Sequence, residues 1–264
     1  MQKLLPIALY LGLLSTACGG SDESSGNSAT TDLRVTIGGS EAAFPHADGH
    51  SGQTAKNVTA GVRSLTLLDD AGGQWVLFDA KPANAAVSYA DGAKSELAVV
   101  APAAVRAGHY TKARLVQDWS RFDIAATLHE GGSATAGTLH GLTVTSDGAL
   151  VDGKELPSGH YAQTFTAGGL SHDYTGTTPI PEHSTTAGAE AVVEDGEWAV
   201  YFPVDLTVAA GQTGTLAIRV NLDHAFRWSD LPGAGYAEGT YDIAPPLYEP
   251  VEQFGGNRFD VTLD

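Results

Sequence analysis

The chain has 264 residues, with 31 acidic against 14 basic side chains and a formal net charge of −17 at pH 7. Nucleic acids and anionic membrane surfaces are bound through cationic protein faces, so this balance argues against both as partners. Cysteine occurs once, which excludes a disulfide within the chain.

The N-terminus has the three-part pattern of a secretory signal. Lys3 supplies a cation, residues 4–14 form an apolar run, and small residues lead up to Cys18. The run is far shorter than the roughly 20 apolar residues that a membrane-spanning helix needs. We therefore predict a cleaved signal peptide over residues 1–17. Its removal takes away Lys3 and no acid, which leaves a net charge of about −18.

The only cysteine, Cys18, lies where the signal would be cut. The preceding residues end in Ala17, and the segment resembles the bacterial lipobox, in which a small residue precedes a cysteine that is diacylated and becomes the mature N-terminus. It departs from that pattern at Ser15, where lipoboxes prefer Leu. The resemblance implies a lipid anchor on Cys18 and, because Gly19 stands where inner-membrane lipoproteins often carry Asp, a place at the outer membrane. Ordinary cleavage near Ala17 is the alternative.

Residues 18–31 are rich in Gly, Ser, Asn and Thr, a composition that cannot bury a core and is typical of a flexible tether. After it, short runs of alternating apolar and polar residues recur between turn signals. Examples are residues 33–37, a hairpin formed by 62–67 and 75–78, and later runs at 95–100 and 110–116. No convincing helical period is present. The pattern predicts an all-β fold, an antiparallel β-sandwich of the immunoglobulin or prealbumin-like type, over residues 32–264.

Several of these runs resemble a family of bacterial cell-surface lipoproteins built on a β-sandwich domain of unknown function. The shared patterns are Val62-Arg63-Ser64-Leu65-Thr66-Leu67, the short strand at 75–78, Ala107-Gly108-His109-Tyr110-Thr111-Lys112-Ala113-Arg114-Leu115, an apolar strand ending at Asp223, and Tyr241-Asp242-Ile243-Ala244-Pro245. The resemblance covers about residues 33–120 and 197–248. It implies a sandwich at the cell surface and brings no established activity.

Residues at about 123–190 fit that family less well and read as an insertion. We predict strands over residues 138–145 and 160–165 and a mobile loop over residues 168–188, rich in Gly, Thr, Pro and His. Two Gly-His-Tyr sequences, at Gly108 and Gly159, are expected at the starts of strands, with Gly108 free to take a positive φ. Tyr110 and Leu115 are expected to contribute to the buried faces.

Histidines beside acids are the strongest hint of a metal site, since imidazole and carboxylate groups bind zinc or copper. The residues concerned are His46, Asp48, His50, His172, Asp173, His183, Asp223 and His224. Solvated loop histidines are the favoured interpretation of these residues, so we expect no cofactor, with a divalent metal as the alternative.

The aromatic residues allow two interpretations, a core or a glycan-binding groove. Alternating positions such as Trp198, Val200 and Phe202 favour the core, because one face of each strand must be buried. Sequence motifs of hydrolases and nucleotide-binding enzymes are absent, although a triad assembled in space leaves no motif.

These observations lead us to expect a non-enzymatic, lipid-anchored module of the cell envelope. It would bind or display a protein or glycan partner that the sequence does not identify. A metal-binding envelope lipoprotein is the second hypothesis, and an envelope hydrolase the third.

Overall fold

The computed structural model describes residues 31–180, 183–186, 188–233, 235–245 and 247–264, and it describes no side chains for residues 183–186. The predicted all-β class is confirmed: the described residues form twenty-one strands and one short 3-10 turn, η1 (Pro102–Ala104). Within these residues no helix is long or apolar enough to cross a bilayer. Signal peptide, Cys18 and nearly all of the tether lie outside the described residues.

The smaller of two facing sheets joins segments from both ends of the chain. Its strand order is β21 (Arg258–Leu263), β16 (Gly214–Asn221), β1 (Leu33–Ser40) and β6 (Ser95–Val100). The pairing of β1 with β16 is parallel and places Leu33 opposite Gly214, whereas the other two pairings are antiparallel. The first strand of the domain is therefore held by residues from its last quarter.

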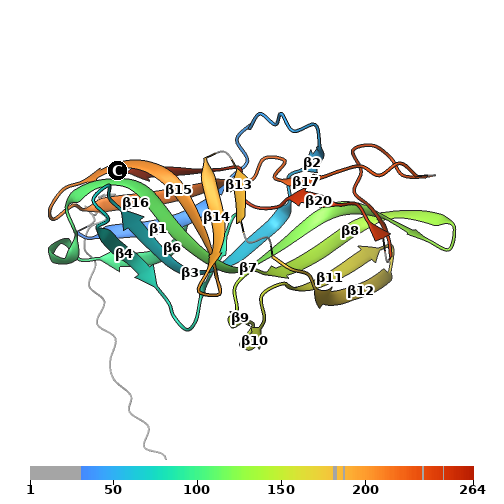
Figure 1. The fold of residues 1–264 in the computed structure, drawn as a ribbon, viewed down its shortest axis with the longest axis horizontal. Coiled ribbons are helices and arrows are strands. Elements are labelled where there is room, and N and C mark those ends of the chain that lie inside the picture. Colours follow the sequence, from blue (N-terminus) through green and yellow to red (C-terminus); the bar gives the residue numbers. More distant parts are fainter. Residues whose placement is uncertain (1–30, 181–182, 187, 234, 246) are drawn as a thin grey trace, which may run out of the picture.

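The larger sheet runs the length of the molecule (Figure 1). Its main order is β12 (Leu170–Thr177), β11 (His160–Ala167), β8 (Ser133–Val144), β7 (Gly108–Glu130), β15 (Glu197–Val208), β14 (Ala189–Glu194) and β13 (His183–Thr186). Attached to this path are β3 (Lys56–Leu68), β4 (Gln74–Asp79), β5 (Ala85–Ser88), β18 (Asp242–Ala244) and β19 (Leu247–Tyr248). Two small sheets complete the fold: β9 (Ala149–Val151) with β10 (Lys154–Leu156), and β2 (Ser51–Gln53) with β17 (Phe226–Trp228) and β20 (Val251–Gln253).

The two sheets pack face to face to form a sandwich, as the alternation of apolar residues predicted. Alternate residues of β1 and β16 are fully buried against Leu65, Leu67 and Leu115 of the larger sheet, and all of them belong to one hydrophobic core. The rings of Phe202 and Phe259 stack between the sheets with their centroids 4.4 Å apart. Tyr110 and Leu115 are both buried, as expected.

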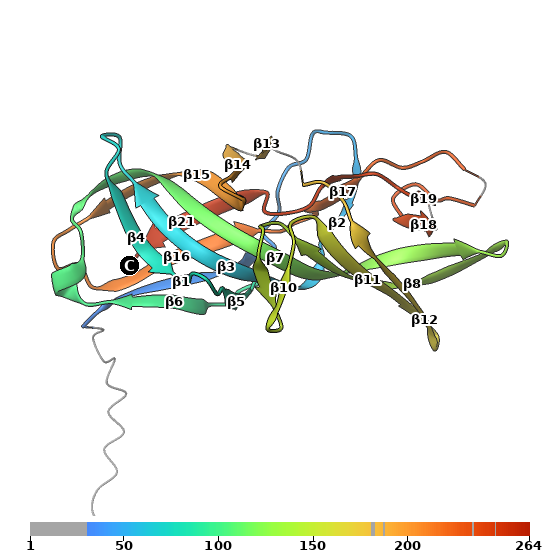
Figure 2. The same cartoon turned by 60° about the horizontal axis from the view of Figure 1, so that its bottom comes forward.

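Strand β7 continues beyond the sandwich and carries an extension of the same sheet (Figure 2). Its first half pairs with β15 and its second half with β8, while β3 pairs along the opposite edge. The strand passes residue 123 without a break, so the residues from 123 onward prolong the sheet of the sandwich. The predicted strands at 138–145 and 160–165 are confirmed as β8 and β11.

The prediction of a loop over residues 168–188 is wrong for most of that segment, which forms β12 and β13. A turn at Gly168 and Gly169, both with positive φ, reverses the chain, and β12 then pairs with β11 along its whole length. Because β12 is an edge strand with mostly polar and exposed side chains, its composition resembles that of a loop. Gly108 begins β7 without the positive φ expected of it, whereas Gly159 takes φ +80° directly before β11.

Candidate functional site

A large hollow lies between the inner face of the larger sheet and the C-terminal segment. Its volume is about 820 Å³, and its walls come from β7, β8, β11, β14, β15 and residues 241–259. Cavities of roughly 300–1,000 Å³ are typical of sites for small organic molecules. We call this hollow the inner cavity.

Aromatic side chains provide much of the wall of the inner cavity. They are Tyr89, Phe122, Tyr161, Trp198, Phe226, Tyr241, Tyr248, Phe254 and Phe259. At one end Phe122 packs on Phe254 with ring centroids 4.2 Å apart, and Phe226 meets Tyr241 edge to face at 5.1 Å. Such rings are large and stiff, so they pack against one another and still leave space that flexible side chains would fill.

The position of Phe122 depends on a glycine on the neighbouring strand. Gly141 lies directly opposite Phe122, and a Cβ atom at Gly141 would come within 2.3 Å of the Phe122 ring. No other residue type allows the ring to lie in this place. The aromatic end of the inner cavity is thus set by a cross-strand pair of Gly and Phe.

The polar groups of the inner cavity are neutral or acidic. Amides come from Gln117, Gln163 and Gln253, and carboxylates from Glu249 and Glu252. None of the described residues that line it is Lys, Arg or His. The cavity therefore offers hydrogen-bonding groups and negative charge, and no described side chain that would neutralise an anion.

Glu249 is the buried acid of the inner cavity, with only 2% of its surface exposed. Its two carboxylate oxygens accept hydrogen bonds from the backbone N–H groups of Leu231 (2.9 Å) and Asp242 (2.8 Å). Burial raises the pKa of Glu249 above its ordinary value, and the nearby acids Asp242 and Asp230 act in the same direction, while the two backbone hydrogen bonds oppose them. Glu249 thus ties the C-terminal segment to the loop at Leu231, joins the start of β18, and keeps a carboxyl group at the cavity wall.

On the opposite, outer face of β7 and β15, charged side chains are buried in pairs. Arg63 and Asp118 lie 2.7 Å apart, with 11% and 0% of their side chains exposed. Glu197 joins them to Arg114 and Lys81, with N···O distances of 3.1 and 2.7 Å. Burial disfavours the charged form of Glu197, but the hydrogen bonds and positive charges of Lys81 and Arg114 outweigh it and hold its pKa below the ordinary value.

The alternation of β7 breaks at Asp118, which lies on that outer face. Leu115 and Gln117 line the inner cavity, and so do Ser120 and Phe122, which have the opposite parity. The register against β3 shifts between Gly61 and Val62 at this point, so Asp118 is an extra residue in β7. Such β-bulges redirect the side chains that follow them.

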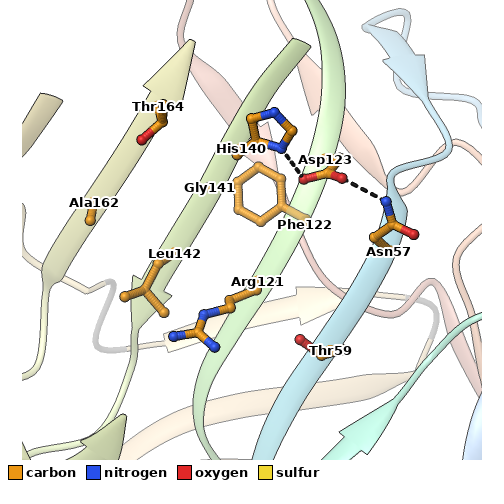
Figure 3. A pocket seen from close by; sticks show the side chains of 10 residues that line it. All are labelled: Asn57, Thr59, Arg121, Phe122, Asp123, His140, Gly141, Leu142, Ala162 and Thr164. Atoms are coloured by element: carbon orange, nitrogen blue, oxygen red, sulfur yellow. Dashed lines mark hydrogen bonds and ion pairs between the residues drawn. The ribbon is translucent and has the colours of Figure 1, made fainter. Parts of the chain in front are cut away.

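A second, shallower hollow of about 390 Å³ lies on the outer face of the extension (Figure 3). Asn57 donates a hydrogen bond to Asp123, whose other oxygen lies 2.7 Å from Nδ1 of His140. Nε2 of His140 lies 3.1 Å from the hydroxyl oxygen of Thr166. Carboxylate, imidazole and hydroxyl in this order match the connectivity of a nucleophilic triad. However, the backbone of β11 around Thr166 is paired with β8 and β12 on its two edges, which leaves it no N–H pair for an oxyanion.

The structure brings two of the predicted metal-ligand groups together across the chain. Nε2 of His46 lies 2.9 Å from the carbonyl oxygen of Asp223, and a carboxylate oxygen of Asp223 lies 2.9 Å from Nδ1 of His224. Asp48 and His50, which follow His46 in the same loop, have other partners. Asp48 pairs with Arg227, and Nδ1 of His50 contacts the Ser229 hydroxyl.

The remaining predicted ligands lie on the two opposite edge strands of the larger sheet, β12 and β13. His172 is 3.5 Å from Glu130, and Asp173 accepts a hydrogen bond from Thr164. His183 belongs to β13, and its side chain is outside the described part of the molecule. Among the described residues, no three or more His, Cys, Asp or Glu side chains are grouped so as to hold a metal ion.

The aromatic side chains divide between the core and the inner cavity. Phe202 and Trp228 are buried in the main core, and Trp119 belongs to a small separate core. Phe122, Trp198 and Phe226 line the inner cavity. Sequence reasoning did not find Tyr248, Glu249 or Phe254, which lie near the C-terminus among Pro and Gly residues and reach the cavity only through the tertiary fold.

Comparison with protein-family models, with curated proteins and with solved structures gave no match.

Proposed function

We propose that this chain is an exported, lipid-anchored binding protein of the cell envelope, most suited to the outer membrane, and that its inner cavity holds a small apolar ligand. The observation that carries the proposal is the hollow of about 820 Å³ whose lining includes nine aromatic side chains. Concave sites of this size, lined by apolar and aromatic side chains with a few polar groups, are typical binding sites for small molecules.

The proposal is for binding without catalysis. The amide and carboxyl groups of the inner cavity are not joined to any described His or Lys that would transfer protons there. The row of Asp123, His140 and Thr166 lies on an open sheet face, where His140 keeps 44% of its side chain exposed. A reaction on this face would take place in water, without the enclosed surroundings that strengthen electrostatic catalysis.

A fluorescent probe tests the binding proposal directly. N-phenyl-1-naphthylamine is neutral and brightens in apolar surroundings, so we expect saturable binding to the purified protein. Ala191→Trp fills part of the cavity from β14 and should abolish binding, whereas Val76→Trp, at a 54% exposed position on β4 outside the cavity lining, should not. Equal binding by both variants, or none by the wild type, would contradict the proposal.

The anchor is proposed from the sequence alone and has its own test. If acyl chains on Cys18 supply the membrane affinity, Cys18→Ser should leave the protein unprocessed or release it into the soluble fraction. Fractionation of membranes, with detection of the protein in each fraction, measures this. A variant that is still processed and still sediments with the outer membrane would show that Cys18 carries no anchor.

A further inference from the structure

We infer that the inner cavity selects organic cations, molecules with an apolar body and one positive charge, over anions of the same size. The inference rests on the proposed binding function and specifies its ligand class. The chemistry of the cavity wall, and not its shape, carries the argument.

The wall of the inner cavity disfavours an anion. A carboxylate or phosphate that leaves water needs a cation or several hydrogen-bond donors in return, or its desolvation is not compensated. The described lining has no Lys, Arg or His and holds two carboxylates, Glu249 and Glu252. Two basic residues close in sequence to the lining are already paired, Arg227 with Asp48 and Arg258 with Asp260. An anion in the cavity would meet repulsion and no described partner.

The aromatic rings of the wall favour a cation. The negative face of an aromatic ring attracts a positive charge, and cages of several rings are used to bind quaternary ammonium groups. Tyr161, Trp198 and Tyr248 are half-buried rings on three different elements around the inner cavity. They provide aromatic surface, and no cation among the described lining residues competes for it.

The positions of Glu249 and Glu252 also favour a cation. Glu252 is exposed in β20, and one of its carboxylate oxygens accepts a hydrogen bond of 2.6 Å from the Ser229 hydroxyl. Glu249 is buried three residues earlier in the chain. One acid at the surface and one inside give a cation a favourable potential during its approach and after it is bound. The net charge of −17 adds to this potential over a longer range.

Three ligands with the same ten-carbon chain separate charge from apolar size. Decyltrimethylammonium, decanol and decanoate are each titrated, below the concentrations at which they aggregate, against protein loaded with N-phenyl-1-naphthylamine at pH 7. We expect decyltrimethylammonium to displace the probe roughly tenfold more strongly than decanol, as cation–π contacts in a desolvated site allow. Decanoate should displace it more weakly than decanol.

Two charge changes at the mouth test the assignment without disturbing the core. Val251 lines the inner cavity and is 45% exposed, so Val251→Lys should weaken displacement by decyltrimethylammonium and strengthen that by decanoate. The matched control is Val76→Lys, a 54% exposed position on β4 that adds the same charge away from the cavity. Glu252→Gln should reduce the preference for the cation about threefold, as expected for one exposed charge, and Glu155→Gln on β10 is its control.

The outcomes separate the two proposals. Displacement by decanol together with equal displacement by the two charged ligands, or a preference for decanoate, would overturn cation selectivity and leave ligand binding intact. A preference for decyltrimethylammonium that responds equally to Val251→Lys and Val76→Lys would place its origin in the net charge and overturn the role of the cavity wall. Failure of the probe to bind at all would overturn the proposed function itself.

Discussion

The outer and inner faces of β7 and β15 treat polar groups in opposite ways. On the outer face, Arg63, Arg114, Asp118 and Glu197 are buried together, and each charge has a partner of opposite sign. On the inner face the same two strands border a hollow with acids, amides and aromatic rings, and no described cation. The four buried charges of the outer face are paired with one another within the protein. The acids and aromatic rings of the inner face border open space, where a ligand could contact them. We therefore assign a stabilising role to the outer face and place the proposed ligand on the inner face.

The largest effect should come from breaking the buried ion pairs. Glu197→Ala leaves Arg63 and Arg114 without their shared carboxylate and should lower the free energy of unfolding by about 3 kcal/mol, as removal of one partner of a buried pair does. Urea denaturation measures it. Binding of N-phenyl-1-naphthylamine under native conditions should be unchanged, and a parallel loss of binding would contradict the separation of the two faces.

The contribution of Glu197 should also depend on pH in a defined direction. Its pKa in the folded protein lies below the ordinary 4.5, so its stabilising effect is present above about 4.5 and is lost as the pH falls through the folded-state value. The difference in unfolding free energy between the wild type and Glu197→Gln should therefore shrink on acidification below pH 4.5. A difference that stays constant to the acid limit would show that the charge of Glu197 contributes nothing.

Leucine truncation compares the packed core with the wall of the cavity. Leu67 and Leu115 are both buried, but only Leu115 lines the inner cavity. Leu115 already faces empty space on one side and has fewer contacts to lose. We expect Leu67→Ala to cost about 3 kcal/mol and Leu115→Ala about 2 kcal/mol, measured by urea denaturation. The reverse order would mean that the cavity is filled or closed in solution.

Gly141 offers a way to change the inner face with little damage elsewhere. Gly141→Ala places a methyl group where the Phe122 ring lies and should push the ring into the inner cavity. Probe binding should fall about tenfold. The free energy of unfolding should decrease by about 1 kcal/mol, the lower end of the range for added volume in a packed site. Gly108→Ala is the control, because its Cβ atom would meet only the Tyr110 ring at 3.4 Å.

The smallest effect is expected on the exposed polar row of the outer face. His140→Ala removes contacts with Asp123 and Thr166 that are open to water, so the free energy of unfolding should fall by no more than about 1 kcal/mol. Thermal unfolding followed by circular dichroism is sufficient. A loss as large as that of Glu197→Ala would mean that exposure does not decide the value of these interactions.

Local sequence patterns predicted most of the strands, but they did not predict the contacts between segments that are distant in the chain. Residues 33–37 and 62–67 alternate because one side of each strand faces the core, so the sequence alone identified both. β12 was missed because an exposed edge strand needs no apolar face. The outer-face ion pairs join Arg63 to Glu197, 134 residues away, after a bulge at Asp118 that no periodicity indicates. The inner cavity depends on the C-terminal segment, whose place over the sheet follows from the fold as a whole.

The parallel pairing of β1 with β16 determines when the domain can be completed. Leu33 emerges near the beginning of synthesis or export, and its partner Gly214 follows roughly 180 residues later. Contacts separated by so much chain form slowly, because a long loop must close before they are rewarded. If the chain crosses a membrane N-terminus first, as proposed, the smaller sheet cannot be completed until almost all of the chain has passed.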